Sequence, residues 1–114
     1  MKLETLYRKA VAAGMANDPR GPEELRRILD DERTKSKKLK EDERDGWEED
    51  RLFNPYADTR ILAGDPATEV GKVIVGIDME VGEVLLAHTL NRDRAEKIDL
   101  VIAHHPQGIA LAQL

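Results

Sequence analysis

The sequence predicts an α/β fold in which N-terminal helices are followed by a βαβ unit with parallel strands. Apolar residues recur at helical spacing early in the chain, whereas two short apolar runs occur at 72–78 and 98–103. A segment with helical spacing separates those runs, and such a strand–helix–strand unit crosses over right-handed with parallel strands. We therefore expect residues 1–51 to be a helical, highly charged extension and residues 52–114 to be the first part of an α/β domain.

The first half of the chain predicts two helices. The first ends at Asn17–Pro19, and the second begins at Gly21–Glu24, where a proline in the first turn and two acids suit the positive end of the helix dipole. Each helix has one apolar stripe. The stripes consist of Leu3, Tyr7, Ala10, Val11 and Met15 in the first helix and of Leu25, Ile28 and Leu29 in the second.

The stretch from Asp30 to Gly46 is dominated by charge, and Leu39 is its only large aliphatic residue. It can be a solvated helix supported by pairs such as Asp31 with Lys35, each worth about 0.2–0.5 kcal/mol, or a mobile arm. The basic run at 35–40 superficially resembles a nucleic-acid patch. Acids on both sides nearly cancel its charge, so we favour a solvated face.

Three of the four aromatic residues cluster after this stretch, as Trp47, Phe53 and Tyr56. Such a cluster can cap the core or anchor a subunit contact. Intramolecular packing is the interpretation that we favour, since aromatic side chains are largely buried in folded proteins.

The second half predicts alternating strand and helix. We expect a short strand at Thr59–Ala63, a turn at Gly64–Pro66 and a β-branched strand at Lys72–Asp78. A helix should follow from Val81 to about Lys97. The last strand, Ile98–Ala103, is so rich in aliphatic residues that we expect it to be buried on both faces, as in a parallel sheet.

Composition excludes several classes of function. The absence of cysteine rules out disulfides, thiolate metal sites and thiol nucleophiles. A formal net charge of −5 disfavours broad binding to a nucleic-acid backbone. We find no apolar run long enough to span a membrane and no pattern of a secretory signal, so we expect a cytoplasmic protein.

The most concentrated chemistry is the pair His104–His105, which follows the last strand and precedes Pro106. Open α/β sheets bind ligands beyond the carboxyl ends of their strands, and neutral imidazole is the commonest metal ligand. Adjacent residues of a strand point to opposite faces, so the two rings would serve one ion only if the chain bends. They can serve two ions, or one ion and a supporting role. The competing interpretation is a polar strand end with one ring bonded to the backbone.

Three other residues are weaker candidates. We expect His88 to be a packed core histidine, because it shares a helix face with Val84 and Leu85. Asp78 ends the strand that precedes the helix, where it can line the site, orient a ligand, or cap the helix, and we favour the cap or another structural role. Asp99 is expected to be an ordinary solvated strand start.

From 59 to 114 the chain resembles the NIF-three-like family, whose members are also described as homologues of GTP cyclohydrolase I type 2. Val73-Ile74-Val75-Gly76-Ile77-Asp78, an amphipathic helix, and Leu100-Val101-Ile102-Ala103-His104-His105-Pro106 carry the resemblance. The resemblance implies a two-lobed α/β fold, a dinuclear metal site and a ring-shaped hexamer. It also implies that His104 and His105 each provide a metal ligand. The family's other ligands, an aspartate, a histidine and a glutamate, would lie beyond Leu114.

Two functions follow as expectations from this resemblance and from ligand chemistry. The first is a metal-dependent hydrolase of the cyclohydrolase kind, with two divalent ions (zinc, iron or manganese), a small-molecule substrate, and Asp78 as a candidate to orient water or substrate. The second is a non-catalytic metal-binding assembly or regulatory protein that acts through oligomer and partner surfaces. Residues 109–114 have the pattern of the first turns of another apolar helix, so we also expect the chain to be a fragment of a longer protein.

Overall fold

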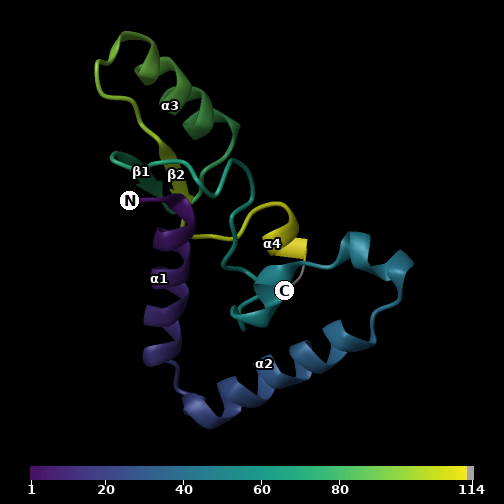
Figure 1. Ribbon diagram of the computed structural model, residues 1–114. Coiled ribbons are helices and arrows are strands. Elements are labelled where there is room, and N and C mark those ends of the chain that lie inside the picture. The colour runs from purple at the N-terminus through teal and green to yellow at the C-terminus, as the bar shows by residue number, and fades with distance from the viewer. Residues whose placement is uncertain (113–114) are drawn as a thin grey trace.

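The computed structural model describes residues 1–112 as helices combined with one small parallel sheet (Figure 1). The elements, in chain order, are α1 (Leu3–Ala16), α2 (Gly21–Lys38), the 3₁₀ helices η1 (Glu41–Gly46) and η2 (Glu49–Leu52), β1 (Val73–Gly76), α3 (Val81–Asp93), β2 (Leu100–Ala103) and α4 (Ile109–Ala112). Of the helices in this range, none is both long enough and apolar enough to cross a membrane. The predicted apolar helix at the end of the chain is confirmed as far as Ala112, and residues 113–114 lie outside the described residues.

The two N-terminal helices are confirmed. Each helix turns one apolar stripe inward. Two side chains in each stripe are at most 7% exposed: Leu3 and Val11 in α1, and Leu25 and Leu29 in α2. Gly21 opens α2 with a φ of 82°, a left-handed conformation that glycine adopts without strain. The helices contact each other near this connection and then diverge, and the 3₁₀ helix η2 packs against α2 (Figure 1).

The charged stretch after Asp30 continues α2 as a solvated helix to Lys38. Its ion pairs differ from the predicted one, because Asp31 pairs with Arg27 at 3.3 Å and Lys35 pairs with Glu32 at 2.5 Å. Both pairs span one helical turn, as the i,i+3 and i,i+4 geometry of a helix surface allows. The helix ends because the backbone at Leu39 is extended, and η1 follows.

The aromatic residues after this stretch pack within the chain, as predicted. Phe53 makes an edge-to-face contact with Tyr7, with ring centroids 5.6 Å apart, and the guanidinium of Arg8 lies 4.0 Å from the Phe53 ring centre. The Tyr56 hydroxyl donates a hydrogen bond of 3.0 Å to Asp18. Trp47 is half-buried, with Arg51 over its ring at 5.8 Å. The contacts of Phe53 and Tyr56 hold the segment after η2 against α1 and the connection that follows it.

The βαβ unit is confirmed. β1 and β2 are parallel neighbours, and Val73 is the register partner of Leu100. Asp99 lies just before β2, where it was expected to be a plain solvated strand start. It is exposed, but its Oδ2 also accepts hydrogen bonds of 2.9 and 3.0 Å from the backbone N–H groups of Gly71 and Lys72. These donors hold the pKa of Asp99 below its ordinary value, and the carboxylate ties the two strand starts together.

Helix α3 ends at Asp93, earlier than the predicted end near Lys97. Asn91 accounts for the difference. Its side-chain amide donates to the carbonyl of Ile98 at 2.9 Å, and its Oδ1 accepts from the N–H of Ile98 at 2.7 Å. These two hydrogen bonds hold Ile98 next to the end of the helix, so that the chain turns back into β2.

The predicted strand at Thr59–Ala63 is wrong, because this segment has no strand partner in the described residues. Side chains satisfy its backbone instead. The carbonyl of Thr59 accepts hydrogen bonds from the Tyr7 hydroxyl at 3.2 Å and from the Asn54 amide at 2.7 Å. The predicted turn that follows is confirmed, with Gly64 at a φ of 104° and a backbone hydrogen bond from Thr68 to Asp65.

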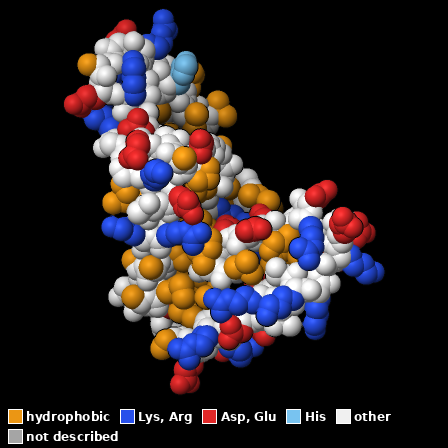
Figure 2. Space-filling view, viewed as in Figure 1, with side chains coloured by type: hydrophobic (Ala, Val, Ile, Leu, Met, Phe, Trp, Pro, Cys, Tyr) orange, Lys and Arg blue, Asp and Glu red, His pale blue; other side chains and the backbone are white. Residues whose placement is uncertain are grey.

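The expectation that the last strand is buried on both faces is also wrong. Alternate residues of the sheet are open, with Val75 62%, Ile77 58% and Ile102 36% exposed. Helix α3 lies at the end of the molecule opposite α2 and leaves this face uncovered, and hydrophobic side chains gather on the surface there (Figures 1 and 2). The radius of gyration is 16.3 Å, whereas a compact domain of this size has one of about 13 Å.

Candidate functional site

The candidate site lies where the two parallel strands end. The backbone ladder continues past the strands, because the N–H of His104 donates to the carbonyl of Gly76 and the N–H of His105 donates to that of Ile77, both at 2.9 Å. The sequence therefore delivers both histidines to the carboxyl edge of the sheet, where α/β proteins bind ligands.

Gly76 and Met79 pack closely next to this edge. Gly76 ends β1, and a Cβ atom built there would lie 2.5 Å from the sulfur of Met79. Met79 is only 8% exposed. The glycine thus lets Met79 pack close to the end of the strand, and a larger residue would displace its flexible side chain.

The two imidazole rings are exposed and lie side by side. Their centroids are 5.3 Å apart and the ring planes are inclined by 36°. The chain bends at His104 and His105, which brings the rings closer than the alternation of a straight strand would. Nδ1 of His105 forms a hydrogen bond of 2.9 Å with Oδ1 of Asp78. The structure thus brings together all three residues that the sequence placed at this edge.

Asp78 is not the cap of α3. Glu80 occupies the N-cap position, and its backbone N–H donates to the Glu83 carboxylate at 2.9 Å. The helix cap, one part of the favoured interpretation of Asp78, is therefore wrong. The Asp78 carboxylate is hydrogen-bonded to His105 instead, which fits both the other favoured interpretation, a structural role, and the alternative that Asp78 lines the site.

His88 is exposed on α3 and is not the packed core histidine that was expected. No element among the described residues covers the face of α3 that carries Val84, Leu85 and His88, so the apolar pattern of this face finds no partner there. The face borders an open groove that reaches the segment after the histidine pair. The groove is lined by Met79, Glu80, Val81, Gly82, Val84, Leu85, His88 and Gln107.

The histidine pair fits part of a metal centre. Imidazole nitrogens suit zinc and iron, and both rings are reachable from solvent. Within residues 1–112, however, no three His, Asp or Glu side chains are arranged closely enough to hold an ion. A complete centre would need further ligands from outside this part of the chain.

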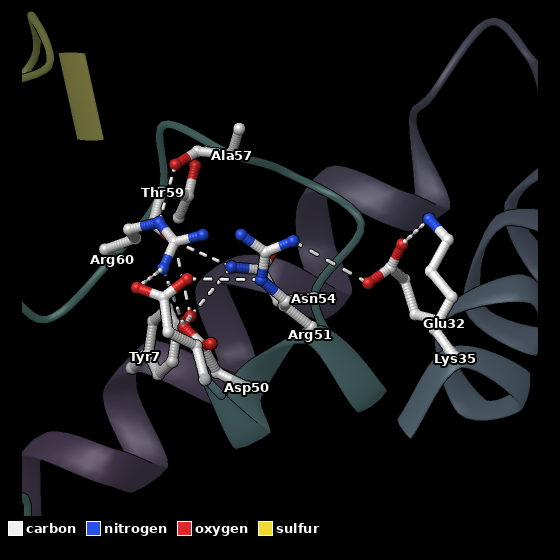
Figure 3. Close-up of polar contacts among 10 residues, drawn as sticks. Tyr7, Glu32, Lys35, Asp50, Arg51, Asn54, Ala57, Thr59 and Arg60 are labelled. Carbon is white, nitrogen blue, oxygen red and sulfur yellow. Dashed lines mark hydrogen bonds and ion pairs between the residues drawn. The ribbon is translucent and has the colours of Figure 1, made fainter. Parts of the chain in front are cut away.

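A second polar cluster, which the sequence did not predict, joins α1 to η2 and the segment 54–60 (Figure 3). The Tyr7 hydroxyl donates to Asp50 at 2.8 Å and accepts a hydrogen bond of 2.7 Å from the amide of Asn54, which is 6% exposed. The Arg60 side chain, 7% exposed, contacts Glu48 at 2.7 Å. Burial, reinforced by the hydrogen bond to Asp50, raises the pKa of Tyr7 well above its ordinary value.

This cluster borders a pocket of about 300 Å³ between α2 and the segment after η2. Hydrogen bonds in the cluster join residues of one element to residues of the next (Figure 3). Such a network fixes the relative position of the elements. No spacing rule reveals it, because Tyr7 lies 43 residues from Asp50 and 47 from Asn54.

Comparison with known proteins finds no match to a family model, to a curated protein or to a solved structure. The resemblance to the NIF-three-like family therefore stays a prediction that depends on the two strand motifs and the histidine pair.

Proposed function

We propose that this chain is a NIF-three-like protein that carries one part of a dinuclear metal centre, with His104 and His105 as ligands. The observation that carries the proposal is the pair of exposed imidazoles, 5.3 Å apart, at the carboxyl edge of a parallel sheet. A centroid separation of 5.3 Å allows both rings to bind one ion, or each ring to bind one of two neighbouring ions. Zinc and iron suit such nitrogen donors, and manganese would suit the centre once carboxylate ligands complete it.

A metal-dependent hydrolase of the GTP cyclohydrolase I type 2 kind is the activity that we assign to the completed centre. When bound there, divalent ions activate water and stabilise negative charge on a substrate oxygen. The open groove between Met79, α3 and Gln107 reaches the segment that follows the histidine pair, which supports entry of a small-molecule substrate near this edge. Asp78 faces His105 at the same edge.

Metal content tests the proposal. Protein dialysed against zinc or manganese should retain metal, and His104→Ala with His105→Ala together should abolish retention, because both ligands at this edge are lost. His88→Ala is the matched control, since it removes the third histidine of the chain from an exposed helix position. Retention that the double variant leaves intact would refute the assignment, provided that circular dichroism shows both variants folded.

A second candidate is a metal-binding assembly protein that acts through its surfaces. Helix α3 and the strands expose several large apolar side chains, with Val81 84%, Leu85 59% and Val75 62% exposed. Monomeric proteins rarely expose contiguous apolar patches of this kind. This surface supports a homo-oligomer in which the strand–helix ends of neighbouring copies pack together.

A further inference from the structure

The parallel register decides which acid meets which histidine. Val73 pairs with Leu100 and Gly76 with Ala103, so the same offset of 27 residues places Asp78 opposite His105. The backbone hydrogen bonds from His104 to Gly76 and from His105 to Ile77 carry this register beyond the named strands. The sheet register therefore places Asp78 and His105 opposite each other at its carboxyl edge, where their exposed side chains form the hydrogen bond.

The hydrogen bond selects one nitrogen of the ring. Asp78 approaches Nδ1 of His105 at 2.9 Å, and a carboxylate can only accept. Nδ1 must then carry a proton, and in the neutral ring this leaves Nε2 with its lone pair free. Carboxylates that hold a histidine in this way fix its tautomer and ring orientation and raise its basicity as a metal ligand.

We infer that Asp78 is a positioning residue that holds His105 as the Nδ1–H tautomer and presents its Nε2 to a divalent metal ion. The presentation of Nε2 to a metal rests on the proposed metal function, whereas the tautomer of His105 is a property of the metal-free chain. His104 has no such role, because the register places Ile77 opposite it. The two adjacent histidines are thus unequal, and only His105 has a carboxylate behind it.

Nitrogen-15 NMR of the imidazole rings tests the inference without metal. Spectra are recorded near pH 8.5, about two units above the ordinary histidine pKa. In the unmodified protein the His105 shifts should report Nδ1–H, and in Asp78→Ala they should move toward those of exposed His88. Asp93→Ala, which removes another exposed acid at the end of α3, should leave them unchanged.

Zinc titration of the same proteins supplies the second readout. Asp78→Ala should weaken binding about 10–100-fold, whereas Asp93→Ala should not. A His105 ring that is mainly Nε2–H, or whose shifts are the same with and without Asp78, would overturn the inference whether or not zinc binds. A tautomer that follows Asp78 in a protein that binds no zinc would uphold the positioning role and refute the proposed metal function.

Discussion

At the scale of single residues, Tyr7 connects α1 to η2 and to the segment that follows η2. Its hydroxyl reaches Asp50, Asn54 and the carbonyl of Thr59, and its ring packs on Phe53. Tyr7→Phe keeps the ring but leaves a part-buried carboxylate and amide without one partner. We expect the free energy of unfolding in urea to fall by about 1–2 kcal/mol.

The raised pKa of Tyr7 adds a pH dependence. The unfolded chain releases the phenol proton near pH 10, whereas the folded protein holds it to higher pH because of burial and Asp50. The contribution of Tyr7 to stability is therefore complete below about pH 10 and is lost as the pH rises through the folded pKa. Urea unfolding at pH 8 and pH 10.5 should show a decline in stability that is smaller in Tyr7→Phe than in the unmodified protein. Equal declines in the two proteins would show that the Tyr7 phenol is not held by this network.

Residue patterns predicted the edge of the sheet better than the N-terminal cluster. His104, His105 and Asp78 were found because strand ends and their order in a βαβ unit are local features of the sequence. Asp50 and Asn54 were not found, since they meet Tyr7 only through tertiary packing. His88 was misjudged for the same reason, because an apolar helix stripe does not reveal whether another element covers it.

At the scale of elements, β1, β2 and α3 were predicted, and their ends were less accurate. Asn91 ends α3 by holding both backbone groups of Ile98, a side-chain effect that apolar periodicity does not contain. The segment Thr59–Ala63 has strand-like residues but no strand neighbour within residues 1–112, so its local propensity alone could not make it a strand. Its backbone is satisfied by side chains instead.

Asp99 gives the element-scale prediction. Its carboxylate holds the starts of β1 and β2 together, and its pKa is lowered by the backbone N–H groups of Lys72 and Gly71. A lowered pKa in the folded protein means that this stabilisation is present above about pH 3.9 and is lost as the pH falls through the folded pKa. Asp99→Ala should therefore unfold more readily than the unmodified protein at pH 7.

The difference between Asp99→Ala and the unmodified protein should shrink as the pH falls below about 4. Thermal unfolding followed by circular dichroism from pH 7 to pH 2.5 measures it, with Asp93→Ala as the control for loss of an exposed acid. A difference that stays constant over this range, or one that Asp93→Ala reproduces, would contradict the role given to the Asp99 carboxylate.

At the scale of the whole molecule, the chain is extended and exposes an apolar strand–helix end. The coarse α/β class was predicted, but the sequence led us to expect a sheet covered on both faces. Aliphatic strands indicate burial by some partner, and they do not say whether that partner belongs to the same chain. Under the second proposed function, neighbouring copies of the chain would cover the exposed face.

Assembly predicts a concentration-dependent mass. In sedimentation equilibrium the unmodified protein should be heavier than a monomer, and Leu85→Glu should shift it toward the monomer by placing a charge in the apolar contact. Thr34→Glu adds the same charge to the exposed surface of α2, away from that face, and should leave the mass unchanged. A protein that is monomeric at all concentrations would contradict the proposed homo-oligomer.

The central claim is that the histidine pair at the sheet edge holds metal. Anomalous diffraction from crystals grown with zinc, recorded above and below the zinc absorption edge, tests it most directly. The account predicts anomalous density about 2.0–2.1 Å from an imidazole nitrogen of His104 and of His105, with Nε2 as the contacting atom of His105. Zinc bound elsewhere on the chain, with both rings free of density, would contradict it.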